Sequence, residues 1–170
     1  SGSSAWARGH ALALYGFSMV YGFVGNGEFL ARAERIADML LARLPEDGIP
    51  YWDFDAPDIP YALKDASAGA IMASAFITLS TQTADKSKAK SYMAMAERQL
   101  RTLASDAYLA KPGENGGFIL KHSVGNLPGV SEVDVPLTYA DYYFLEALVK
   151  YANKNTGERV CIPAFSTTLN

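Results

Sequence analysis

The chain has 170 residues, of which 49% are hydrophobic and 19% are charged, and its net charge is −3. This composition excludes a disordered chain, and the length suits one domain or part of a larger one. Because a negative chain offers no basic surface, we expect no nucleic-acid partner. No apolar run approaches the roughly 18 to 20 residues that a membrane span needs, so we also expect no membrane partner.

Cysteine content and the N-terminal sequence set further limits. Cys161 is the only cysteine, which excludes an intrachain disulfide and a cysteine-rich metal site. The first residues lack a charged segment followed by a purely apolar one, as a signal peptide would have. The sequence therefore leaves the localisation unknown.

The first two predicted helices form a hairpin. Residues 5–24 carry apolar side chains at three- and four-residue steps, with Ser4 placed as the N-cap. The sequence GNG at 25–27 ends this helix. Residues 28–44 have one apolar and one charged side, which is typical of an amphipathic surface helix.

A second hairpin follows a loop with four prolines, residues 45–64. Residues 65–81 carry small side chains on nearly every side, which suits an inner helix packed among others. Asp65 stands at its start as an N-cap or first-turn acid. Residues 85–105 are amphipathic, with lysines and arginines on one face, and suit an outer helix.

A glycine-rich loop at about 108–134 leads into a fifth predicted helix, residues 135–153, while the tail from 154 has no strong period. The order is inner, outer, inner, outer, inner, so we predict an all-α fold of helical hairpins. The hairpins share no exact repeat, which argues against a repeat solenoid. We expect the inner helices to begin at one face together with the long loops, where ligands commonly bind.

Several side chains would gather at that face. Arg8 lies on a helix face meant for burial and needs an anion, which is either Asp65 or Asp141 or a ligand. A lone histidine such as His10 is more often a satisfied interior residue than a catalytic one. By pattern alone, Trp6 is a core aromatic.

Residues in the two long loops extend this set. Asp53 and Asp55 would share one side of an extended segment, which suits paired carboxylates or a cation site. Loop acids that cap a helix or pair with an arginine are commoner, so we interpret both as support for the cavity rim, with Trp52 near a ligand. His122 is expected to be a mobile surface residue. Near the start of the fifth predicted helix, Tyr139 is the tyrosine to test first.

Four motifs, in this order, resemble the C-terminal half of the unsaturated glucuronyl hydrolases, glycoside hydrolase family 88: SAWARGHALALYGF, LPEDGIPYWDFDAP, KDASAGAIMAS and VDVPLTYADYYFLEAL. The resemblance covers residues 3–152. It implies that residues 1–170 are the C-terminal portion of a single (α/α)6 toroid domain, about half of the ring, and that the upstream half is absent.

The resemblance also implies an activity for the full protein. Family members are glycosidases that remove a 4,5-unsaturated uronic acid from oligosaccharides released by a lyase. An aspartate acts as general acid and base to hydrate the C4=C5 vinyl ether, so the usual rule of carboxylate spacing does not apply. Neither a metal nor an organic cofactor is expected, and a bacterial cytoplasm or periplasm is implied.

By the same resemblance, two residues of the WARG motif contact the substrate. Arg8 would offer a planar fork of donors to its carboxylate, and Trp6 would form an aromatic wall for the sugar. Trp52, Tyr139 and His10 complete the candidate contacts, although His10 replaces a glutamine that the family often has.

The resemblance places the catalytic machinery elsewhere. The family's catalytic aspartates lie upstream of the WARG motif, so we expect the general-acid aspartate upstream of Ser1. We accordingly expect no catalytic residue in this chain and no activity from it alone.

Two other functions remain open. One is a non-catalytic sugar-binding or scaffold half-toroid, and the other is an unsaturated rhamnogalacturonyl hydrolase of family 105, which shares the chemistry. The expected partners are an unsaturated uronic-acid oligosaccharide and either the missing N-terminal half or a second copy. A half toroid would expose the apolar flanks of its first and last hairpins, which favours association.

Overall fold

The computed structural model describes residues 4–156. Its elements are α1 (Ala7–Val24), α2 (Gly27–Arg43), α3 (Ala66–Gln82), α4 (Lys86–Leu103), the short 3-10 helix η1 (Asn115–Gly117) and α5 (Thr138–Thr156). Within residues 4–156 there is no strand, and only isolated β-bridges connect the loops. The predicted all-α fold is therefore confirmed.

Three expectations concern the ends of the chain. Ser1, upstream of which the general-acid aspartate is expected, lies outside the described residues. Cys161 and most of the predicted tail also lie outside them. The location of the general acid therefore stays a prediction.

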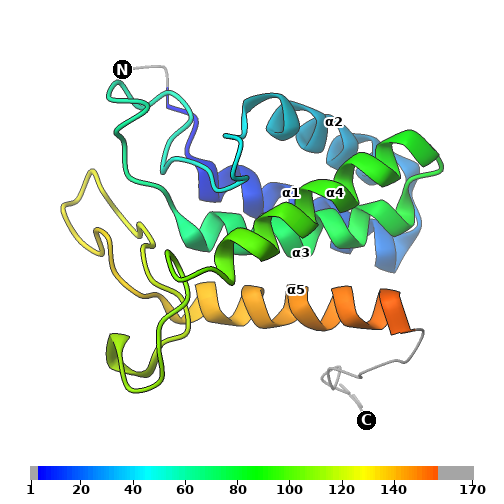
Figure 1. The fold of residues 1–170 in the computed structure, drawn as a ribbon. Coiled ribbons are helices and arrows are strands. Elements are labelled where there is room, and N and C mark those ends of the chain that lie inside the picture. Colours follow the sequence, from blue (N-terminus) through cyan, green and yellow to red (C-terminus); the bar gives the residue numbers. More distant parts are fainter. Residues whose placement is uncertain (1–3, 157–170) are drawn as a thin grey trace, which may run out of the picture.

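The helices are arranged as two hairpins and a single fifth helix (Figure 1). Helices α1, α3 and α5 begin at one end of the molecule, where the long loops gather, and α2 and α4 run back in the opposite direction (Figure 1). Helix α3 packs against each of the other four helices. The predicted alternation of inner and outer helices is correct.

The composition of α3 explains its central place. Of its 17 residues 14 are buried, and most of them are small or apolar. At Gly69, an added Cβ would come within 2.9 Å of the Ile49 Cδ1 atom, so the missing side chain lets the preceding loop pack against the helix. The outer helix α2 buries only the stripe of Ala33, Ala37 and Leu40.

Of the two helix caps predicted from the sequence, one is correct and one is wrong. Asp65 caps α3 by accepting a hydrogen bond from the Ser67 amide at 3.0 Å, as predicted. The expectation that Ser4 caps α1 is wrong, because the helix begins at Ala7 and its cap position, Trp6, makes no side-chain bond. The Ser4 hydroxyl donates instead to an acid of a distant loop.

Helix length and hydropathy bear on membrane association. Among the helices within residues 4–156, none combines the length and the apolar character that a membrane crossing needs.

Candidate functional site

The guanidinium of Arg8 is enclosed at the N-terminal end of α1. The residue is only 7% exposed. Its Cζ atom lies 4.8 Å from the ring centroid of Trp6 and 5.2 Å from that of Tyr139. The negative faces of both rings favour the cation. Three of the predicted site residues are therefore brought together, although they come from opposite ends of the described chain.

The donors of Arg8 are directed at the chain itself. Nη1 donates to the carbonyl oxygen of Val124 at 2.6 Å and to the Ser67 hydroxyl at 3.4 Å. Nη2 donates to the carbonyl oxygen of Gly125 at 2.5 Å. The Asp65 carboxylate lies 3.6 Å from Nη1. Arg8 thus connects α1 with the start of α3 and with the loop that precedes α5.

Asp65 is the buried anion of this group. One carboxylate oxygen accepts hydrogen bonds from the amide and hydroxyl of Ser67 and from the Val124 amide at 3.2 Å. The other oxygen has no hydrogen-bond partner and faces Arg8. Desolvation raises the pKa of Asp65, and the hydrogen bonds and the Arg8 charge oppose that shift without cancelling it.

Asp141, the other acid considered for Arg8, has a different role. Its carboxylate accepts hydrogen bonds from the amides of Ile119 and Leu120 at 2.8 and 2.9 Å. It therefore ties the first turn of α5 to the preceding loop.

The two loop acids are also structural. Asp53 is buried and accepts hydrogen bonds from the Ser4 hydroxyl and the amides of Ala5 and Asp55. Desolvation acts against its charge, but these hydrogen bonds outweigh it and lower the pKa of Asp53. Asp55 pairs with Arg43 at 2.5 Å. Within residues 4–156, no group of three or more His, Cys, Asp or Glu side chains could hold a metal ion.

A cleft of about 320 Å³ opens beside Arg8. We call it the tryptophan cleft, because Trp6 and Trp52 line it together with Ser4 and residues 124–128. The amide of Ala7 donates to the Trp52 carbonyl at 3.0 Å, which holds the two tryptophan segments side by side. Large aromatic surfaces with a few polar groups are typical of small-molecule sites.

The two histidines lie outside the lining of this cleft. His10 is half-buried, with Nδ1 2.9 Å from the Trp6 carbonyl oxygen and its ring edge-on to Phe54. Its place in substrate binding stays a prediction. His122 is a surface residue, and its Nδ1 lies 2.7 Å from Asp134.

Comparison with known proteins shows what the chain is similar to. No family model matches the chain. The chain is 48% identical over 153 residues to the unsaturated glucuronyl hydrolase of Formosa agariphila, a match that covers 89% of this chain and 37% of that protein. The crystal structure of an unsaturated glucuronyl hydrolase specific for heparin is 51% identical, with a TM-score of 0.87 over 90% of this chain and 41% of that one.

The chain is homologous to part of the unsaturated glucuronyl hydrolases. A Streptococcus agalactiae hydrolase variant crystallised with dGlcA-GalNAc6S is 29% identical, with a TM-score of 0.80 over 89% of this chain and 40% of that one. The chain thus spans about two fifths of the length of the relatives it matches. The resemblance stated from the four motifs and the helical toroid fold are both confirmed.

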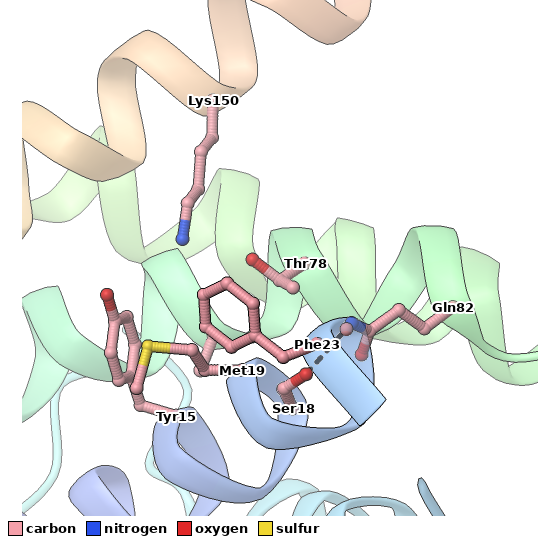
Figure 2. A pocket seen from close by; sticks show the side chains of 9 residues that line it. Tyr15, Ser18, Met19, Phe23, Thr78, Gln82 and Lys150 are labelled. Carbon is pink, nitrogen blue, oxygen red and sulfur yellow. Dashed lines mark hydrogen bonds between the residues drawn. The ribbon is translucent and has the colours of Figure 1, made fainter. Parts of the chain in front are cut away.

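A second hollow, of about 300 Å³, lies between the three inner helices and has no counterpart in the sequence analysis. We call it the interhelical hollow. Figure 2 shows side chains from α1, α3 and α5 pointing into it, among them Tyr15, Met19, Phe23, Thr78, Gln82 and Lys150.

Charged residues of α5 meet α1 and α3 at this hollow. Glu146 accepts hydrogen bonds from the Tyr15 hydroxyl at 2.9 Å and from Ser74, and it pairs with Lys150 at 3.4 Å. Lys150 Nζ also donates to the Ser74 hydroxyl at 2.8 Å. Desolvation lowers the pKa of Lys150 and raises that of Tyr15. The i, i+4 spacing of Glu146 and Lys150 on an apolar helix is the sequence signal that could have indicated this pair.

Proposed function

We propose that this chain is part of an unsaturated uronyl hydrolase, which removes a 4,5-unsaturated uronic acid from lyase-generated oligosaccharides by hydrating the C4=C5 vinyl ether. The observation that carries the proposal is the similarity to unsaturated glucuronyl hydrolases over 89% of the chain. The relatives described above carry glucuronyl names, which favours this activity over the rhamnogalacturonyl and the non-catalytic alternatives.

The proposal gives the chain one wall of the substrate site. Trp6 and Trp52 would stack on the sugar in the tryptophan cleft, where both rings are accessible. Arg8 would place its positive charge beside a uronate carboxylate. Tyr139, whose ring covers the guanidinium, and His10 would contact the substrate at the edge of this group.

The general acid would come from a part of the protein outside this chain, upstream of Ser1. Two acids bind lining residues of the tryptophan cleft, Asp65 at the Val124 amide and Asp53 at the Ser4 hydroxyl, and the fold already uses both. Asp65 is fully buried beside Arg8, and Asp53 is buried under three hydrogen bonds. Neither can donate a proton to a substrate at the cleft. We therefore expect the chain to be inactive on its own.

The interhelical hollow opens on the side of the chain formed by the inner helices α1, α3 and α5, which we call the inner face. This hollow supports a partner for the inner face. Helix α3 has neighbours on both sides, whereas exposed large apolar side chains occur on α1 and α5, including Met19, Phe23 and Leu145. Phe23 is 82% exposed. In the proposed whole enzyme, the remaining helices of the toroid cover this face. When the chain is made without those helices, a second copy of the chain covers the face instead.

A chimera tests the activity. The chain is joined to the part of the Formosa agariphila hydrolase that it does not match, and the loss of ultraviolet absorbance from an unsaturated uronyl disaccharide is followed. We expect turnover by the chimera and none by the chain alone. Trp52→Leu should raise KM about tenfold, whereas Tyr61→Leu, which removes a 90% exposed aromatic of the same loop, should leave KM unchanged. A folded chimera that leaves the disaccharide intact contradicts the proposal.

A further inference from the structure

The loop before α5 forms one wall of the tryptophan cleft, and its conformation is closely defined. We call residues 122–135 the clamp loop. Ser123 and Val135 exchange two backbone hydrogen bonds of 3.0 Å, and Asn126 and Ser131 exchange two of 3.1 Å. At the tip, Val130 has a φ of 52°, which is unfavourable for a β-branched residue. Such backbone persists only where the surroundings hold it in place.

The Arg8–Asp65 pair holds the clamp loop at another residue, Val124. The Val124 carbonyl accepts a hydrogen bond from Arg8, and the Val124 amide donates one to Asp65. The two ends of a buried ion pair therefore bind the two polar groups of a single residue. A second bond from Arg8 to the Gly125 carbonyl fixes the next peptide.

Arginine suits this task better than lysine would. Its planar fork donates to two adjacent carbonyls at once, and its Cζ atom lies over the rings of Trp6 and Tyr139. A lysine ammonium would reach the same place as a single point of charge, without the fork or the stacking.

We infer that Arg8 and Asp65 are positioning residues that hold the clamp loop against the starts of α1 and α3, and thereby set the width of the tryptophan cleft. The residues that they fix, Val124 and Gly125, are also lining residues of that cleft. This inference concerns the free chain and does not depend on which sugar, if any, the cleft binds.

Hydrogen exchange of the chain, measured by mass spectrometry without substrate, tests the clamp. Arg8→Lys should speed exchange about tenfold in residues 122–135 and leave α4 unchanged. The matched control is Arg43→Lys, because Arg43 also donates to a loop carbonyl, that of Phe54, and also lies over an aromatic ring. That variant should speed exchange only near Phe54. Unchanged exchange in residues 122–135 of a folded Arg8→Lys chain overturns the inference.

A second variant tests the role of Arg8 in holding the clamp loop if Arg8→Lys does not fold. Tyr139→Leu keeps every hydrogen bond of Arg8 and removes only one of the two rings that cover it. We expect about threefold faster exchange in residues 122–135, and no change would overturn the inference.

Fluorescence gives a readout that a general loss of stability would not mimic. The chain has two tryptophans, and both line the tryptophan cleft. In a Trp6→Phe background, Trp52 alone reports the cleft, and its ring is not one that the guanidinium contacts. Arg8→Lys should increase acrylamide quenching of Trp52 in the folded chain, and equal quenching with and without Arg8 would contradict a role in cleft width.

Discussion

Two charged clusters join the same three inner helices, one at the loop end and one in the interhelical hollow. Each contains a buried acid and a basic partner: Asp65 with Arg8, and Glu146 with Lys150. At the loop end, the cation is enclosed and donates to backbone carbonyls. In the hollow, the Lys150 side chain is 27% exposed and its hydrogen bond goes to a side chain, Ser74.

The two ion pairs therefore differ in which parts of the structure they hold together. Burial disfavours the charged form in both clusters, raising the pKa of Asp65 and lowering that of Lys150. At the loop end this cost is offset by bonds that position a loop and cap a helix. In the hollow it is opposed by the Glu146–Lys150 pair within α5 and by the bonds of that pair to Tyr15 of α1 and Ser74 of α3. Mutations should therefore disturb the wall of the tryptophan cleft in the first cluster and helix packing in the second.

The largest effect is expected at Asp65. Asp65→Ala removes the N-cap of α3, the acceptor of the Val124 amide and the counter-ion of Arg8. We expect a loss of about 3–4 kcal/mol in the free energy of unfolding, measured with urea. Asp85→Ala is the control, because Asp85 caps α4 in the same way but is exposed, and it should lose about 1 kcal/mol. Equal losses would show that the loop-end cluster adds nothing beyond capping.

A mutation in the cluster of Glu146 and Lys150 should lower the free energy of unfolding by less. Glu146→Gln keeps an acceptor for Tyr15 and Ser74 but leaves Lys150 without its anion. We expect a loss of about 2 kcal/mol. The control is Glu97→Gln, since Glu97 also accepts a hydrogen bond from a tyrosine of α5, Tyr151, but pairs with no cation in the described structure. It should lose less than about 0.5 kcal/mol, and a similar loss from both variants would contradict the importance of the ion pair.

Much of the loop-end cluster could be predicted from sequence. Helical periodicity distinguished inner from outer helices, and this order placed the starts of all inner helices at one face. Trp6, Arg8, Asp65 and Tyr139 were therefore expected together, and the structure brings them together. Asp65 was also recognisable as a cap, because an N-cap depends on residues within one turn.

The partners of these residues could not be predicted in the same way. Arg8 binds the carbonyls of Val124 and Gly125, and a backbone carbonyl carries no signature in the side-chain sequence. Ser4 was a plausible local cap, but a contact with Asp53 from a distant loop takes its hydroxyl. A local sequence pattern carries no information about such long-range competition. The predicted cap at Ser4 is therefore wrong, whereas the predicted cap at Asp65 is correct.

Acid should weaken the loop end through Asp53. Because its pKa in the folded chain lies below the ordinary 3.8, its ionised form stabilises the fold above that pH, and the contribution is lost as the pH falls through the folded-state pKa. Asp53→Asn lacks this contribution at every pH. We expect the stability gap between the two proteins to narrow by about 1 kcal/mol from about pH 6 to about pH 3. The pH dependence of stability that Asp65 causes has the opposite sign, but it is the same in both proteins and cancels from their stability gap. A gap that stays constant with pH would therefore contradict the lowered pKa of Asp53.

The smallest effect on stability is expected where the hollow opens. Phe23 is 82% exposed, so Phe23→Ser should change the free energy of unfolding by less than about 0.5 kcal/mol. The same change should reduce self-association of the chain in sedimentation velocity, because it removes the most exposed aromatic from the apolar inner face. Tyr61→Ser, at a 90% exposed residue outside the hollow, should alter neither quantity. If Phe23→Ser instead destabilised the fold and left association unchanged, the chain itself would be closing the hollow, and the inner face would need no partner.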